Sequence, residues 1–411
     1  MKGCLRYRRS DITETVFKAQ IEKIAAGGAG LARLEGKSIF IEGSVPGETV
    51  LCRITEEHPS WSRAELLEII EDSPDRVQPV CDFYGICGGC NLQHLSYTAQ
   101  LAAKTVIIKD TFIHIGGFCP PEPLVFPSKP WGYRNRMQLH CIRQLHCIQQ
   151  LPGQSWGLKA KKSNEIIPIS GCPIADPGIQ SLLRGTENQT QVPLPPPEKD
   201  RFTVYARDGL LLREGGIQRG KTRILDRELA LDAGVFFQSN GTMLERLVMD
   251  LREIAAGLNS AGQSLPVADL YCGVGTFSVF LGEFFPHIDL VEENKFSLAL
   301  ARENLMPLIA AGTSTGFFAQ RCENWVKNRR RYGFIVADPP RQGLNPALTY
   351  WLKANGPPLL AYVSCNPATL ARDSKILLAG GYKLTELRLY DFYPQTAHIE
   401  SLAVFTRSYA P

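Results

Sequence analysis

Apolar and polar residues alternate in the first part of this chain, whereas the last part carries short, unbroken apolar runs. In residues 14–72 the segments KSIFIEG and ETVLCRITE alternate or carry β-branched residues, and glycines interrupt them at short intervals. Short strands broken by glycine are typical of a small β-barrel of the OB type. We therefore expect an OB-like barrel in residues 1–72, before a boundary in the polar segment EDSPDRVQPV (71–80).

The middle of the chain predicts one helix followed by mixed structure. The segment YTAQLAAKTVIIKDTFIHIGG (97–117) has helical periodicity and ends on two glycines, which commonly stop a helix. Residues 120–230 are mixed and mostly β-like, with a proline-rich loop at 187–200. We expect a central mixed α/β domain over residues 73–234.

From residue 235 the pattern changes to apolar runs that are each followed by a loop and a helical segment. Four such units begin in LPVADLYCGVG, IDLVEEN, YGFIVADPPRQGL and PPLLAYVSCNP. This alternation predicts a parallel, doubly wound, Rossmann-like sheet over residues 235–411. Ligands of such sheets bind beyond the carboxyl ends of the strands, so the residues at those four ends are the candidate site.

Composition narrows the protein class only slightly. The chain has 411 residues, 44% of them hydrophobic, and a net charge of +4, which indicates a polyanionic partner only weakly. No run approaches the roughly 20 apolar residues of a membrane helix, and the N-terminus lacks a secretory pattern. We expect a cytoplasmic protein without a membrane partner, in which the 12 cysteines are reduced and serve as ligands, nucleophiles or core residues.

The first two strand ends indicate a nucleoside cofactor. Gly273 and Gly275 form a glycine-rich turn that lets the backbone approach a ligand, and Glu292 ends the next strand, where a carboxylate can accept ribose hydroxyls. The turn is shorter than the G-x-G-x-x-G of pyrophosphate sites, which favours S-adenosylmethionine, a nucleoside without phosphates. The alternatives are an ordinary tight turn and, for Glu292, a solvated helix cap.

The other two strand ends carry groups that could react with a base. Asp338 precedes two prolines, and Arg341 follows where an amino-methylating enzyme would have an aromatic residue. Cys365 ends the fourth strand, and a thiolate that adds to uracil C6 makes C5 nucleophilic toward a sulfonium methyl. A base must then remove the C5 proton, and Glu400, with His398 in support, is the candidate. Cys365 could instead be core filler and Glu400 a solvated charge.

Four motifs in this order, DLYCGVGTFSV, DPPRQGL, SCNPATLARD and PQTAHIESL, resemble the RNA 5-methyluridine methyltransferases, specifically their iron–sulfur branch that modifies 23S ribosomal RNA. The segment GGAGLARLEGKSIFIEGSVPGE resembles a TRAM domain, an RNA-binding OB-like barrel. The resemblance implies that Cys365 is the nucleophile and Glu400 the base, and that Phe236 packs near the target base. It also implies cofactor contacts for four residues: Gln238, Tyr271, Glu292 and Asp338.

Four further cysteines have metal-ligand spacing. Cys81, Cys87 and Cys90 follow a C-x5-C-x2-C pattern, and Cys172 is followed by proline. Four thiolates suit either a [4Fe–4S] cluster or zinc, and the spacing together with the resemblance favours the cluster.

The resulting hypothesis is an S-adenosylmethionine-dependent uracil-C5 methyltransferase of 23S ribosomal RNA, with no obligate protein partner indicated. The stretch WGYRNRMQLH (131–140) interleaves aromatic and basic residues that suit unstacked RNA bases, although on composition a plain strand with a basic face fits equally. The family that the chain resembles carries a similar Tyr-Arg-Asn stretch, which favours RNA recognition. A transfer RNA substrate is the first alternative. The second is an inactive iron–sulfur RNA-binding protein, against which the presence of both Cys365 and Glu400 argues.

Overall fold

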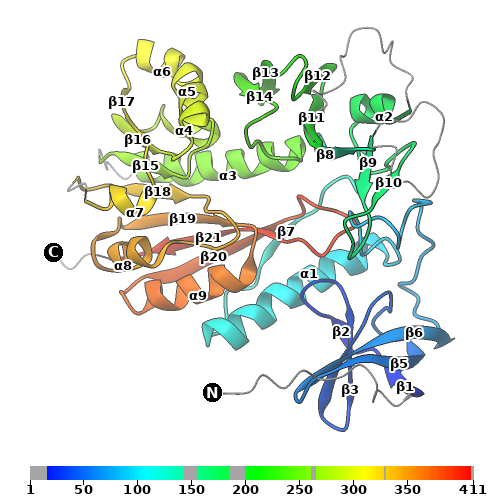
Figure 1. Ribbon diagram of the computed structural model, residues 1–411. Helices are drawn as coiled ribbons and strands as arrows, with labels where there is room; N and C mark the ends of the chain where they lie inside the picture. Colours follow the sequence, from blue (N-terminus) through cyan, green and yellow to red (C-terminus); the bar gives the residue numbers. More distant parts are fainter. Residues whose placement is uncertain (1–15, 143–155, 185–199, 261–264, 328–329, 409–411) are drawn as a thin grey trace, which may run out of the picture. The chain divides into compact units, whose positions relative to one another are not determined.

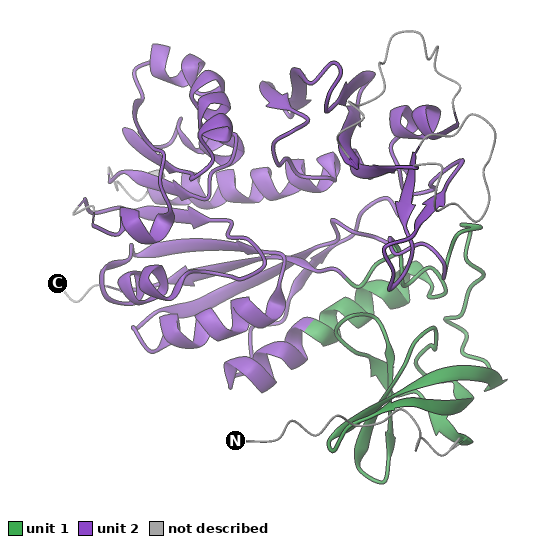
Figure 2. Cartoon of the chain, viewed as in Figure 1, with its two compact units in different colours: residues 1–84, 90–107, 395–397 green, residues 85–89, 108–394, 398–411 purple. Residues whose placement is uncertain are grey.

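The computed structural model describes residues 16–142, 156–184, 200–260, 265–327 and 330–408 (Figure 1). The chain forms two compact units (Figure 2). Unit 1 comprises residues 1–84, 90–107 and 395–397, and unit 2 comprises residues 85–89, 108–394 and 398–411. The boundaries expected at 72/73 and 234/235 stay predictions, and the second of them lies inside unit 2.

Unit 1 contains a six-stranded sheet in the order β1-β5-β6-β4-β3-β2. Its buried side chains alternate along the strands, as the period-two pattern predicted, and include Ala32, Ile39, Ile41 and Val50. Cys52 belongs to this core, where burial raises the pKa of its thiol to about 11, so it serves as packing. The strands are β1 (Val16–Gln20), β2 (Lys23–Ile24), β3 (Gly30–Leu34), β4 (Lys37–Ile41), β5 (Thr49–Glu57) and β6 (Trp61–Glu71).

The expected helix near residue 100 is present. Helix α1 (Tyr97–Thr111) continues into a π-helical turn, η1 (Phe112–Gly116). Gly117 then ends it with a φ of 77°, a left-handed conformation that glycine adopts without strain. The last residues of α1, from Ile108 on, are part of unit 2.

The first part of unit 2 is mostly β, as expected. A five-stranded sheet has the order β10-β9-β8-β11-β12, and β13 pairs with β14 in a separate hairpin. Most of the predicted proline-rich loop, residues 187–199, lies outside the described residues. The elements are β8 (Arg136–Cys141), β9 (Trp156–Lys159), β10 (Ile166–Pro168), α2 (Pro177–Arg184), β11 (Arg201–Arg207), β12 (Leu210–Arg213), β13 (Arg219–Ile224) and β14 (Arg227–Asp232).

An eight-stranded sheet dominates the rest of unit 2, in the order β17-β16-β15-β18-β19-β21-β20-β7. Strands β15 to β19 are parallel, which confirms the doubly wound architecture. Strand β21 runs antiparallel to its neighbours β19 and β20. The strands are β7 (Leu124–Phe126), β15 (Val267–Leu270), β16 (His287–Val291), β17 (Ser314–Phe318), β18 (Phe334–Ala337), β19 (Leu359–Ser364), β20 (Lys383–Tyr390) and β21 (Glu400–Thr406).

Both faces of this sheet are buried, which explains the unbroken apolar runs. Val336 and Ala361 pack in one core cluster with Leu244 of α3. Their neighbours Leu360 and Tyr362 point to the opposite face and are also buried, and the Tyr362 hydroxyl donates to α9 there. The helices are α3 (Gly241–Ser260), α4 (Thr276–Leu281), α5 (Lys295–Asn304), α6 (Met306–Ala310), α7 (Cys322–Trp325), α8 (Pro346–Asn355) and α9 (Pro367–Leu378). Within the described ranges, no helix is long and apolar enough to cross a membrane.

Candidate active site

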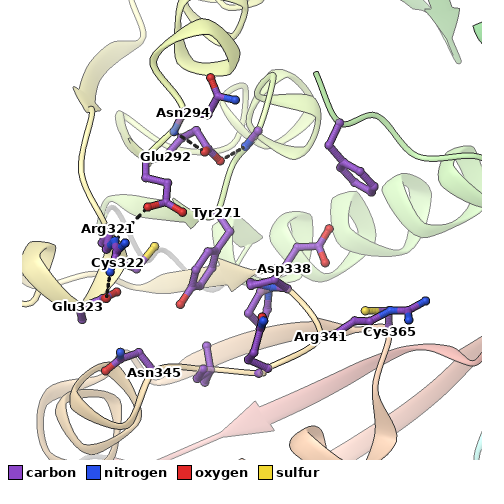
Figure 3. A pocket seen from close by; sticks show the side chains of 18 of the residues that line it. Tyr271, Glu292, Asn294, Arg321, Cys322, Glu323, Asp338, Arg341, Asn345 and Cys365 are labelled. Carbon is purple, nitrogen blue, oxygen red and sulfur yellow. Dashed lines mark hydrogen bonds and ion pairs between the residues drawn. The ribbon is translucent and has the colours of Figure 1, made fainter. Parts of the chain in front are cut away.

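A cavity of about 1030 Å³ lies at the carboxyl ends of the parallel strands of unit 2 (Figure 3). The structure brings together in its lining all six residues that the sequence predicted for catalysis and cofactor binding: Gln238, Tyr271, Glu292, Asp338, Cys365 and Glu400. Each comes from the end of a strand or from a loop beside it. The strands therefore supply a rigid frame from which groups distant in sequence converge.

The glycine-rich turn and Glu292 form one hydrogen-bonded unit. Glu292 Oε2 accepts from the Gly273 N–H at 3.1 Å, and Oε1 accepts from the Asn294 N–H at 2.7 Å. The helix cap belongs to Asn294, whose side chain accepts from Phe296 and Ser297 at the start of α5. Glu292 is thus no ordinary helix cap, and its remaining lone pairs are available at the cavity.

The two glycines of this turn differ in what surrounds them. Gly273 has a φ of 54°, lines the cavity, and has no atom within 4 Å of the position a Cβ would occupy. Gly275 has a φ of 79°, and its Cβ would meet Ala301 at 3.0 Å. Gly275 therefore lets the turn pack against α5, whereas Gly273 leaves open space where a ligand can approach the backbone.

Asp338 and Gln238 form a polar pair within the cavity. Asp338 follows β18 and accepts a long hydrogen bond of 3.4 Å from Gln238 Nε2. Burial raises the pKa of Asp338 to about 7, and the bond from Gln238 opposes this rise. Gln238 Oε1 is buried without a hydrogen-bond partner in the described structure. The pair thus offers one unused acceptor and one carboxyl group to a ligand.

Cys365 is held at the end of β19 by its two neighbours. The Ser364 hydroxyl accepts from the Asn366 N–H at 3.2 Å and donates to the Asn366 carbonyl at 3.1 Å, bracketing the cysteine. Asn366 caps α9, and Pro367 occupies its first turn, where a missing N–H costs nothing. The abrupt Ser-Cys-Asn-Pro turn therefore leaves the thiol at the cavity, half-buried, rather than in the core.

Glu400 reaches the same place because β21 is antiparallel. It is the first residue of β21, so it lies at the sheet edge where the parallel strands end. The register pairs Ser401 with Ser364, and the Ser401 hydroxyl donates to the Ser364 carbonyl at 3.3 Å. Burial and the nearby Asp338 raise the pKa of Glu400 well above its usual value. Its Oε1 has no hydrogen-bond partner among the described residues.

Arg341 is a residue of the site to which the sequence analysis gave no role. It lines the cavity beside Cys365 (Figure 3), and its charge lowers the pKa of both Cys365 and Glu400. Burial, Glu400 and Asp338 outweigh it and raise the pKa of the Cys365 thiol to about 11. The Asn366 side chain donates to the Arg341 carbonyl at 2.8 Å, which links the loop after β18 to the cysteine turn.

Aromatic side chains complete the cavity. His398 and Tyr393 both line it and meet edge to face, with ring centroids 5.7 Å apart. Phe236 also lines the cavity, is 61% exposed, and has the Arg136 guanidinium 5.6 Å from its ring centroid. Within WGYRNRMQLH, by contrast, Tyr133 is buried and its hydroxyl donates to the Pro394 carbonyl, so it is a core residue.

The four predicted metal ligands are divided between the units. Cys81 and Cys90 belong to unit 1, and Cys87 and Cys172 belong to unit 2. Within the described residues no group of three or more histidine, cysteine, aspartate or glutamate side chains is arranged to hold a metal ion. The four thiols have the donor chemistry that a [4Fe–4S] cluster requires.

Comparison with known proteins places the chain among RNA-modifying enzymes. Residues 14–67 match the TRAM domain, and residues 317–408 match the tRNA (Uracil-5-)-methyltransferase family. The chain is 30% identical to a 23S rRNA (uracil(1939)-C(5))-methyltransferase RlmD of a Shewanella species, over 92% of this chain and 93% of that protein. An uncharacterized RNA methyltransferase of Treponema denticola is also 30% identical, over 94% and 98%.

A solved structure has the same fold over almost the whole chain. It is the tRNA (uracil-54, C5)-methyltransferase of Pyrococcus abyssi in complex with S-adenosyl-L-homocysteine. The TM-score is 0.71 with 23% identity, covering 95% of this chain and all of that one. The two matched domains and the full-length relatives together show that this chain belongs to the TRAM-containing RNA uracil-C5 methyltransferases.

Proposed function

We propose that the protein methylates C5 of a uridine in 23S ribosomal RNA through covalent addition of Cys365 to uracil C6. The observation that carries this proposal is the paired register of β19 and β21, which sets Cys365 and Glu400 in one cavity with Glu292 and Asp338. The residues predicted as nucleophile, base and cofactor contacts thus line one cavity. The ribosomal substrate is suggested by the relatives named for 23S RNA.

The residues at one end of the cavity fit the methyl donor. The free lone pairs of Glu292 can accept both ribose hydroxyls, and the space over Gly273 admits the ligand against the backbone. The unpartnered oxygen of Gln238 and the carboxyl group of Asp338 can accept from an ammonium group. S-adenosylmethionine, when bound, supplies an electrophilic methyl group on a sulfonium.

The protein side chains then carry out the remaining steps. The Cys365 thiolate forms a bond to uracil C6, and the displaced electron pair makes C5 nucleophilic, so that C5 takes the methyl group. Glu400 removes the C5 proton, the C5–C6 double bond forms again, and the C6–sulfur bond breaks to return the thiolate. Arg341, beside the thiol, stabilises the thiolate at the start and end of this cycle.

The buried environment suits Glu400 for proton abstraction. Little water solvates its carboxylate, because the side chain is only 2% exposed and Oε1 has no partner in the described structure. A carboxylate held in such surroundings has a raised pKa and takes up a proton more readily. The same burial excludes water from the covalent intermediate.

Two variants test the mechanism with different expected results. Cys365→Ala should fold and bind S-adenosylhomocysteine but transfer no methyl group, because nothing activates C5. Glu400→Gln should add to RNA and then stall, so a covalent protein–RNA band should accumulate on denaturing gels. Full turnover by Cys365→Ala would rule out the covalent route, and a Glu400→Gln protein without a shifted band would remove Glu400 as the base.

A competition between ribosomal RNA and transfer RNA tests which of them is the substrate. Unmodified ribosomal RNA and transfer RNA are incubated with the protein and labelled S-adenosylmethionine, and the labelled nucleotide is mapped. We expect label in 23S RNA at C5 of a uridine. Label in transfer RNA alone would favour the second candidate, which the fold of the archaeal transfer RNA enzyme supports.

We further propose that four cysteines bind a [4Fe–4S] cluster: Cys81, Cys87, Cys90 and Cys172. The donor set supports this, because four thiolates with a Cys-Pro at the last position suit such a cluster better than zinc. No step of the reaction passes through it. We propose instead that it orders the segment in which three of its ligands lie.

A further inference from the structure

Three residues shortly before strand β21 belong to unit 1, although β21 itself belongs to unit 2. Pro394 and His398 are assigned to unit 2, but Gln395, Thr396 and Ala397 between them are assigned to unit 1. Glu400 follows only three residues later and is the first residue of β21. The β-ladder pairs Glu400 with Tyr390 and Ser401 with Ser364, and the segment 395–397 is bound separately on the N-terminal side of Glu400.

Gln100 of α1 binds Gln395 through its whole carboxamide. Gln100 Oε1 accepts from the Gln395 N–H at 2.9 Å, and Gln100 Nε2 donates to Gln395 Oε1 at 3.0 Å. Nε2 also contacts the carbonyls of Leu92 and Leu95, at 3.1 and 2.9 Å. Gln100 is 1% exposed and Gln395 3% exposed, so no water replaces these bonds if they are lost.

Asn91 binds the other end of the segment. Its Oδ1 accepts from the Ala397 N–H at 2.9 Å, and its Nδ2 donates to the Gly27 carbonyl at 2.8 Å. The backbone N–H groups of Asn91 and Leu92 both donate to the Gln395 carbonyl, at 3.1 and 3.0 Å. The segment is thus bound to residues 91–100 of unit 1 and, through the Asn91 side chain, to the loop between β2 and β3.

The segment needs this support because its backbone is strained. Gln395 has a φ of 67°, in the left-handed region, although it is not glycine. Such a conformation costs of order 1–3 kcal/mol and persists only where surrounding bonds fix it. The reciprocal bonds to Gln100 are the contacts that fix it here.

We propose that Gln100 and Asn91, through their bonds to the segment 395–397, are positioning residues for Glu400 in the proton-abstraction step. This inference rests on the proposed function of Glu400. Loss of these bonds frees the chain before His398 and displaces the carboxylate, while Cys365 keeps its own support from Ser364 and Asn366. Addition to C6 and methyl transfer then continue, and release of the methylated RNA slows.

The experiment follows a single turnover of full-length protein on its RNA with labelled S-adenosylmethionine. In Gln100→Ala, methyl transfer should stay near the wild-type rate, and release should slow by about 10- to 100-fold, as expected for a misplaced catalytic group. The covalent band should accumulate as in Glu400→Gln, and the Kd for RNA should not change. A purely structural defect would lower the melting temperature and reduce methyl transfer without accumulating the band.

Matched variants separate the contacts. Asn91→Ala removes both side-chain bonds, whereas Asn91→Asp keeps the acceptor for Ala397 and removes the donor to Gly27. Release should slow more in Asn91→Ala than in Asn91→Asp, and this pair decides the question should Gln100→Ala fail to fold. Gln218→Ala is the control, because Gln218 binds Gly215 and Asp232 in another part of the chain, and it should behave as wild type.

Failure of the positioning role and failure of the proposed mechanism give different results. If Glu400→Gln forms the band but Gln100→Ala and Asn91→Ala release RNA at the wild-type rate, the positioning role is wrong and the proposed mechanism stands. If Glu400→Gln forms no band, the proposed mechanism is wrong, whatever the other variants show.

Discussion

At the scale of single residues, the central problem is how a thiol in an acidic, half-buried place becomes a nucleophile. Burial, Glu400 and Asp338 disfavour the thiolate and raise the pKa of Cys365 to about 11, while Arg341 is the cation that opposes them. In the proposed mechanism only the thiolate attacks C6, so any change of these charges alters the reactive fraction of Cys365. Arg341 thus has a role that can be measured without RNA.

The rate of Cys365 alkylation by iodoacetamide reports this balance directly. In the free protein the rate should rise about tenfold per pH unit until the pH approaches the thiol pKa of about 11, because the thiolate fraction rises in that way. Arg341→Ala removes the charge that lowers this pKa, so alkylation at a fixed pH should be slower, while Arg341→Lys should stay close to wild type. Mass spectrometry assigns the modified cysteine, and the exposed Cys119 is the internal reference.

An unchanged rate in Arg341→Ala would mean that the guanidinium does not act on the thiol in solution. A faster rate would mean that the side chain shields Cys365 from the reagent rather than stabilising its anion. Arg341 would then have no part in the ionisation proposed for the reaction.

At the scale of elements, strand direction determines where the chemistry lies. Four parallel strands end at one edge, and their last or following residues are Tyr271, Glu292, Asp338 and Cys365. Glu400 instead begins its strand, and it reaches the same edge only because β21 runs the other way. The proposed base, at the start of one strand, and the proposed nucleophile, at the end of the neighbouring strand, thereby line the same cavity.

Much of this arrangement could be predicted from the sequence, because short-range patterns encode it. The apolar runs predicted the parallel strands, and the strand-end rule then placed Glu292, Asp338 and Cys365 at one edge. The contacts of Arg341, Gln100 and Gln395 could not be predicted, because a charged residue after two prolines and isolated glutamines carry no local pattern. The segment 395–397 lies about 300 residues from its partners in sequence, and only the tertiary fold joins them.

The glycine-rich turn gives a prediction that separates ligand space from packing. Gly273→Ala should weaken binding of S-adenosylhomocysteine by about tenfold, roughly 1.4 kcal/mol, since the new methyl group lies in open cavity space. Gly275→Ala should mainly lower the melting temperature, because its Cβ meets Ala301 in α5. Calorimetric titration and thermal unfolding measure the two effects.

Strain alone is controlled with Gly132→Ala, since Gly132 also has a positive φ, of 65°, and open space around it. Gly132 is not among the residues that line the cavity. If Gly132→Ala weakened ligand binding as much as Gly273→Ala, the effect would come from backbone strain and not from the site.

At the scale of the whole molecule, the segment 395–397 belongs to unit 1, whereas the proposed base Glu400 belongs to unit 2. Residues 395–397 are bound by 91–100, and this stretch directly follows the cysteine-rich segment. Asn91 is adjacent to Cys90, and the Cys81 N–H donates to Gln93 Oε1 at 3.2 Å. Order in the cysteine-rich segment should therefore extend to the residues that hold Gln395 and Ala397.

This connection between the cysteine-rich segment and the residues that bind Gln395 and Ala397 predicts the effect of removing iron. The purified protein should contain iron and sulfide, and removal of iron by a chelator should loosen residues 81–93 and so weaken the hold of Asn91 on the segment 395–397. Iron-free protein should then accumulate the covalent RNA band, as is expected for Gln100→Ala, with methyl transfer slowed less than release.

Cys81→Ala should reproduce this result, whereas Cys119→Ala, at an exposed cysteine outside the proposed ligand set, should not. Zinc in place of iron in the purified protein would contradict the cluster, and wild-type release by iron-free protein would show that the cysteine-rich segment acts independently of the base.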